Sequence, residues 1–113
     1  PATGSHIESR KRWMLSTLSD RDRVVVDDGA AKALTAHGRS LLPAGIKEVQ
    51  GDFQRGDVIG IADSQRQVIA CGITNYSARD LETIKGANSR RILGLLGYQY
   101  GEEVVHRNNL VVY

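Results

Sequence analysis

The sequence predicts a mostly β protein with short α-helices, folded as a small pseudo-barrel. Short apolar segments at residues 46–49, 58–61 and 68–75 have the composition of β-strands. Glycines, which permit positive φ or close backbone approach where strands turn, separate the apolar segments of the first half: Gly38, Gly45, Gly51 and Gly56. At 113 residues the chain suits one domain, and folding at that size buries roughly two thirds of the unfolded surface.

The N-terminal residues comprise a short polar segment and a predicted first strand. Residues 1–9 are small and polar, which predicts the end of an interdomain linker or a cloning remnant, so the domain is expected to span residues 10–113. The apolar Trp13, Met14 and Leu15 predict a short first strand, and residues 19–23 predict a charged turn after it.

A strand and a helix follow. The β-branched residues 24–26 predict a strand. Asp28 is the expected N-cap of a helix whose apolar residues recur at helical spacing, and Gly38 is its expected stop.

The centre of the chain predicts three strands, at residues 45–50, 58–62 and 68–75, with a polar hairpin turn at residues 63–67. Phe53 is expected to anchor the core. The single cysteine, Cys71, lies in an apolar strand, so we expect a buried thiol in a reducing compartment.

The C-terminal third predicts two short helices and two closing strands. The first helix is expected to run from its cap, Ser77, to residue 85. The second, at residues 89–96, is expected to pack Ile92, Leu95 and Leu96 against the barrel and to stop at Gly97. Residues 102–106 and 110–113 predict the closing strands, around a polar turn at residues 107–109.

A family resemblance rests on the pattern G-x-S-L-L-P-x-G-I-x-x-V-x-G-x-F-x-x-G-D-V-I-x-I at residues 38–61, followed by V-I-A-C-G-I-T-N-Y at residues 68–76. It resembles the PUA domain, a pseudo-barrel found mostly in RNA-modifying enzymes and in a few metabolic ones. With the flanking R-K-R-W-M-L at residues 10–15 and I-L-G-L-L-G-Y-Q-Y-G-E-E-V-V-H-R-N-N-L-V-V at residues 92–112, the chain looks like the C-terminal PUA domain of bacterial glutamate 5-kinase.

Composition and charge leave several classes of partner open. The net charge of +2 and pI near 9.0 are mild for a nucleic-acid binder, and the slight basic excess lies chiefly at Arg10, Lys11 and Arg12. RNA binding is therefore permitted without being predicted. The sequence holds no apolar run near the roughly 18 residues of a membrane span, so we expect a cytoplasmic protein without membrane contact.

The sequence predicts no catalytic or metal-binding residues. It lacks the G-x-x-x-x-G-K-[ST] loop that cradles phosphates, and its three histidines are not spaced as a ligand group. The acidic pairs at residues 27–28 and 102–103 are better explained by helix capping and by a solvated turn than by acid–base catalysis.

The resemblance implies where the chemistry of the longer enzyme lies. In glutamate 5-kinases an N-terminal amino-acid-kinase domain phosphorylates the γ-carboxylate of glutamate with ATP and Mg²⁺, so no cofactor is expected in this domain. The kinase domain of the same chain is then the expected partner, within a homo-oligomeric parent enzyme. A regulatory or structural appendage is the favoured role.

RNA binding is the alternative role. PUA domains of RNA-modifying enzymes bind RNA on the first helix and the loop after it. In this chain those positions are Lys32, Gly38, Arg39, Ser40, Leu41 and Leu42, with Arg10, Lys11 and Arg12 as candidate phosphate contacts. Because Phe53 is the one aromatic residue of the central block and is expected in the core, the sequence predicts no stacking platform for bases.

Overall fold

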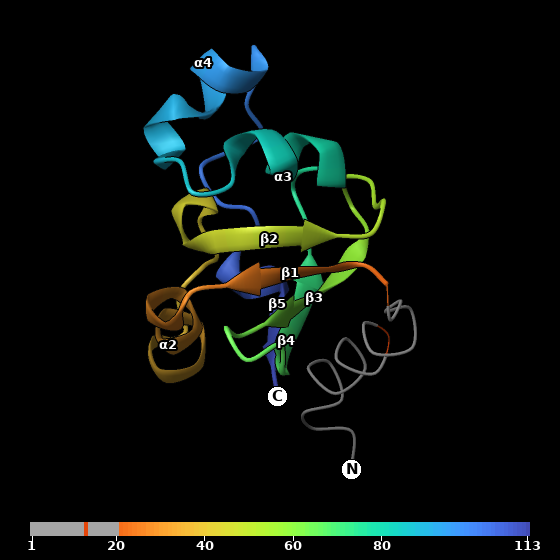
Figure 1. Ribbon diagram of the computed structural model, residues 1–113, viewed down its shortest axis with the longest axis vertical. Coiled ribbons are helices and arrows are strands. Elements are labelled where there is room, and N and C mark those ends of the chain that lie inside the picture. The colour runs from red at the N-terminus through yellow and green to blue at the C-terminus, as the bar shows by residue number, and fades with distance from the viewer. Residues whose placement is uncertain (1–12, 14–20) are drawn as a thin grey trace.

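Residue 13 and residues 21–113 are described in a computed structural model of the protein (Figure 1). Within this part of the chain, a five-stranded mixed sheet is accompanied by three α-helices and three short 3-10 helices. The prediction of a mostly β protein with short helices is confirmed. None of the described helices is long and apolar enough to cross a membrane.

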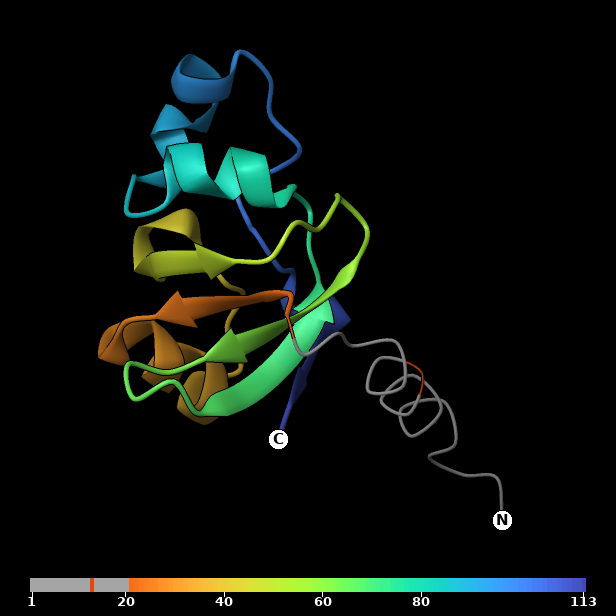
Figure 2. The ribbon, with the colours of Figure 1, turned by 45° about the vertical axis from the view of Figure 1, so that its right-hand side comes forward.

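The sheet has the strand order β2-β1-β3-β4-β5. Its strands are β1 (Arg23–Val26), β2 (Ile46–Gln50), β3 (Val58–Ala62), β4 (Val68–Ile73) and β5 (Leu110–Val112). Neighbouring strands are antiparallel except β1 and β3, which are parallel. Parallel neighbours need a crossover connection, and here the chain between them forms α2 and β2 (Figure 2).

The core lies where the sheet meets α2 and α3. All five residues of the central strand β3 are buried, because neighbours cover both of its faces. Phe53 is only 1% exposed, which confirms it as a core anchor, and the Cys71 side chain is buried, as predicted.

Helix α2 (Asp28–His37) begins one residue earlier than the sequence predicted. Asp27, and not Asp28, is the N-cap, because its backbone is extended and its Oδ1 accepts a hydrogen bond from the Ala30 amide at 2.7 Å. Gly38 ends the helix in the left-handed conformation, with φ of 58°, as predicted.

Helices α3 (Ala78–Ile84) and α4 (Ile92–Leu96) stack at one end of the molecule, with α3 between α4 and β2 in both views (Figures 1 and 2). The Ser77 cap is confirmed, since its hydroxyl accepts a hydrogen bond from the Asp80 amide at 3.2 Å. The predicted apolar face of the second helix is only partly correct. Ile92 is buried and Leu96 half-buried, but Leu95 is 38% exposed because the outermost helix is covered on one side only.

One predicted strand is wrong, and another is contradicted at the one residue of it that the structure describes. Residues 102–106 form no strand, and only Val105 pairs with Leu41 as an isolated bridge. The segment passes between loops, where the Val104 amide donates to the Leu41 carbonyl and the Val104 carbonyl accepts from the Asn75 amide, both at 2.7 Å. At the other end of the chain, Trp13 is helical and not in the predicted strand. The other two residues of that predicted strand, residues 14 and 15, lie outside the described residues.

Candidate functional site

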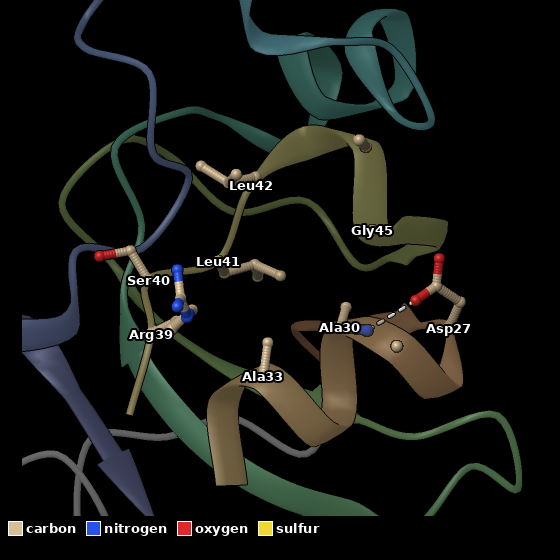
Figure 3. A pocket seen from close by; sticks show the side chains of 10 residues that line it. Asp27, Ala30, Ala33, Arg39, Ser40, Leu41, Leu42 and Gly45 are labelled. Carbon is tan, nitrogen blue, oxygen red and sulfur yellow. Dashed lines mark hydrogen bonds between the residues drawn. The ribbon is translucent and has the colours of Figure 1, made fainter. Parts of the chain in front are cut away.

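A groove of about 290 Å³ lies between α2 and the chain that follows it (Figure 3). Most of its lining side chains are small or apolar. They are Asp27, Gly29, Ala30, Ala33, Arg39, Ser40, Leu41, Leu42, Ala44 and Gly45.

One wall of the groove is the small-residue side of α2, where Ala30 and Ala33 point toward Leu41 (Figure 3). The 3-10 helix η1 (Pro43–Gly45) lies directly against this wall. A Cβ atom on Gly45 would lie 2.5 Å from the Ala30 Cβ, so only glycine permits this approach. The Asp27 amide also donates to the Gly45 carbonyl at 2.9 Å.

The opposite wall is the segment that leaves Gly38. Leu41 is only 1% exposed and forms the floor, tied by the hydrogen bond from its amide to the Val105 carbonyl at 2.9 Å. Leu42 is 44% exposed at the rim. The Ser40 hydroxyl accepts a hydrogen bond from the Arg107 amide at 2.8 Å, which fixes the segment to the C-terminal part of the chain.

Charges of both signs surround the apolar floor. Arg39 is exposed at the mouth, and the Asp27 carboxylate is used in capping α2. A second hollow shares Arg39, Ser40 and Leu42 with the groove and is bordered by Glu102, Glu103 and Arg107. The site can therefore bind an apolar or backbone group on its floor and an anionic group beside Arg39.

The structure brings together four of the residues predicted for RNA contact: Arg39, Ser40, Leu41 and Leu42 all line the groove. Lys32 is exposed on α2 but does not line the groove, because it lies two residues from Ala30 and so on another side of the helix. Gly38 makes the turn that leads into the site. The predicted contacts at residues 10–12 lie outside the described residues.

The sequence did not predict the small residues of the helix wall. Ala30 and Ala33 stand three apart, a spacing that places small side chains on one helix side, and this is the signal that could have revealed them. Among residues 13 and 21–113, no three His, Cys, Asp or Glu side chains lie close enough to hold a metal ion.

An aromatic cluster that does not line the groove was also not predicted. The rings of Tyr98 and Tyr100 lie 5.4 Å apart, and Tyr100 lies 5.6 Å from Tyr76. Burial raises the pKa of Tyr76, and the hydrogen bond to Asp80 raises the pKa of Tyr98. The expectation of no stacking platform for bases was argued from the central block, and the exposed rings of Tyr98 and Tyr100 lie outside that block.

The sequence that forms most of the sheet and the groove matches a known family. The family model described as "PUA domain" matches residues 22–96, which includes β1 to β4, α2, α3 and the entire groove. The chain belongs to the PUA domain family. The predicted PUA fold is confirmed.

The chain is also similar in sequence to a glutamate 5-kinase and in structure to a solved PUA domain. The glutamate 5-kinase of Dictyoglomus turgidum is 50% identical over 107 residues, which cover 95% of this chain and 29% of that protein. The chain thus spans about three tenths of the length of this relative. A PUA domain of Aeropyrum pernix K1, solved with tartrate, is 29% identical with a TM-score of 0.56, covering 76% of this chain and 41% of that one.

A structure of an H/ACA RNP bound to a substrate RNA has a TM-score of 0.57 to this PUA domain. It is 22% identical and covers 82% of this chain and 24% of that one. At this identity the similarity concerns the fold alone.

Proposed function

We propose that this PUA domain is a non-catalytic regulatory or structural module of a glutamate 5-kinase. The observation that carries the proposal is the 50% identity to such a kinase across 95% of the chain, combined with coverage of only 29% of the kinase. The domain is then one part of a longer protein.

In this proposal the longer protein phosphorylates the γ-carboxylate of L-glutamate with ATP to give L-glutamyl 5-phosphate, the first step of proline synthesis in the cytoplasm. The remaining seven tenths of the chain hold ATP, Mg²⁺ and the catalytic residues, in a homo-oligomeric enzyme. The PUA domain acts on that enzyme from outside its active site.

The surface of the domain supports a role directed at protein. Its net charge is only +2, and two glutamates and two arginines border the hollow beside the groove. Mixed charge of this kind is ordinary at protein interfaces, whereas nucleic-acid binders concentrate positive charge on one face.

Deletion of the domain tests the proposal. In the full-length enzyme, removal of residues 10–113 should leave glutamate phosphorylation measurable and should change either inhibition by proline or the size of the oligomer. The full-length enzyme purified in parallel is the control. An enzyme unchanged in both properties would contradict a regulatory or structural role.

RNA binding is the second candidate function, and the geometry of the groove favours it. Arg39 and Ser40 stand at the mouth of an apolar floor, in the segment where the PUA resemblance places RNA contacts. An arginine there can neutralise a phosphate while the floor receives part of a base or a sugar.

A further inference from the structure

The loop after α4 presents two exposed tyrosine rings that are held in place before any partner arrives. Tyr98 is 42% exposed and Tyr100 is 41% exposed. The Arg55 guanidinium carbon lies 3.9 Å from the centroid of the Tyr100 ring, a cation–π contact.

Hydrogen bonds fix the loop beneath these rings. The Tyr98 hydroxyl donates to Asp80 Oδ1 at 2.6 Å. The buried Tyr76 hydroxyl donates to the Gly101 carbonyl at 2.5 Å and accepts from the Tyr100 amide at 2.8 Å. A surface that is already ordered loses little conformational entropy when it binds.

Exposed apolar side chains are concentrated in this region. Seven large hydrophobic residues are exposed in the described part of the chain, and four of them lie within eight consecutive residues: Leu93, Leu95, Tyr98 and Tyr100. Tyrosine and arginine are enriched at the energetic centres of protein interfaces. The face composed of Tyr98, Tyr100 and Arg55, called here the tyrosine face, has this composition.

Similarity to known proteins indicates which partner covers the tyrosine face. The PUA family model ends at residue 96, before both tyrosines. The glutamate 5-kinase match covers 95% of the chain and therefore includes residues 98–100. The two tyrosines thus lie in a segment that the kinase match includes and the general PUA match does not. In a glutamate 5-kinase, the candidate partner for this segment is the rest of the same chain.

We propose that the tyrosine face is the surface on which this domain docks against the remaining seven tenths of the longer chain. This inference rests on the proposed function. The receiving surface has an apolar recess for the two rings and a carboxylate or carbonyl group opposite Arg55. Asp80 places a carboxylate beside Tyr98, and a carboxylate repels phosphate, so a protein surface fits better than RNA.

Hydroxyl-radical footprinting of the full-length chain tests the docking, because the oxidation rate of a side chain reports its solvent accessibility. The reference is this domain alone, which contains its own sheet and core. We expect Tyr98 and Tyr100 to be oxidised several-fold more slowly in the full-length chain. Equal rates in the two samples would overturn the proposal.

Two variants of the full-length chain sharpen the test. Tyr98→Ala should restore the oxidation rate of Tyr100 to that of the free domain, whereas Tyr98→Phe, which keeps the ring, should retain the protection. Circular dichroism confirms that each variant is folded. If Tyr98→Ala does not fold, Arg55→Glu replaces it and should have the same effect.

Other occupants give different results. Protection that appears only at higher protein concentration would assign the face to a second copy and overturn the proposal, as would protection that requires added RNA. Glutamate phosphorylation is measured on the same samples. Protected rings in a chain without this activity would refute the proposed function alone, and unprotected rings in an active chain would refute the docking alone.

Discussion

Gly45 and Ala30 are in such close contact that a methyl group on the glycine would lie 2.5 Å from the alanine Cβ. This contact holds η1 against α2, and both residues line the groove. Since Gly45 does not have a positive φ, space and not backbone conformation requires a glycine here.

We therefore expect Gly45→Ala to destabilise the domain by about 1–3 kcal/mol, the usual cost of overpacking a tight contact. Urea unfolding measures the loss. Gly94→Ala is the matched control, because a Cβ there meets open space in a helix, and it should be neutral or stabilising by about 0.5–1 kcal/mol. Equal effects of the two substitutions would contradict this explanation.

Asp27 caps α2, and its removal should cost about 1 kcal/mol of the free energy of unfolding, within the usual range of about 0.5–2 kcal/mol. Asp27→Ala loses the acceptor for the Ala30 amide, whereas Asp27→Asn keeps an oxygen there and should retain most of the stability. Urea unfolding of both variants checks this. If Asp27→Ala left the free energy of unfolding unchanged and Asp28→Ala lowered it, Asp28 would be the N-cap, as the sequence predicted.

Partial burial, together with the neighbouring Cys71, raises the pKa of Tyr113 from 10.0 to about 12. Because the folded state holds the phenolic proton more tightly than the unfolded chain, the stabilisation is complete below pH 10 and is lost as the pH rises toward about 12. Urea unfolding across this window should show a steeper loss for the wild type than for Tyr113→Phe. Identical pH dependence of the two proteins would show that Tyr113 titrates normally.

If the groove binds RNA, Arg39→Ala should weaken binding and reduce the slope of log affinity against log salt by about 1, the value for one lost phosphate contact. Fluorescence anisotropy with a labelled pool of structured and single-stranded RNA measures both quantities. Arg91→Ala removes an exposed arginine of the 3-10 helix η2 (Ser89–Arg91), away from the groove, and should leave the slope unchanged. The same slope for both variants would exclude Arg39 as a phosphate contact.

Much of the fold could be predicted from local sequence. Strands β3 and β4 follow from apolar runs, and the end of α2 follows from Gly38, because only glycine readily adopts its φ of 58°. The error at Asp28 arose because two adjacent aspartates carry the same capping signal. The N-cap is whichever of the two residues adopts the extended conformation, and in the structure that residue is Asp27.

The candidate site could be predicted only in part. The segment from Arg39 to Leu42 was found through the family resemblance, but its partners on α2 became visible only once the helix was placed against Gly45. The tyrosine face was missed because Arg55 and Tyr100 lie far apart in the sequence.

Local sequence was enough to establish the mostly β class and the main strands and helices, because apolar periodicity, caps and glycine conformations act over a few residues. The PUA family was found through the motif resemblance at residues 38–61 and 68–76. The groove, the aromatic cluster and the irregular path of residues 102–106 emerged only from the folded chain. Each of these depends on contacts between segments distant in the chain, such as Leu41 with Val105, which local patterns do not encode.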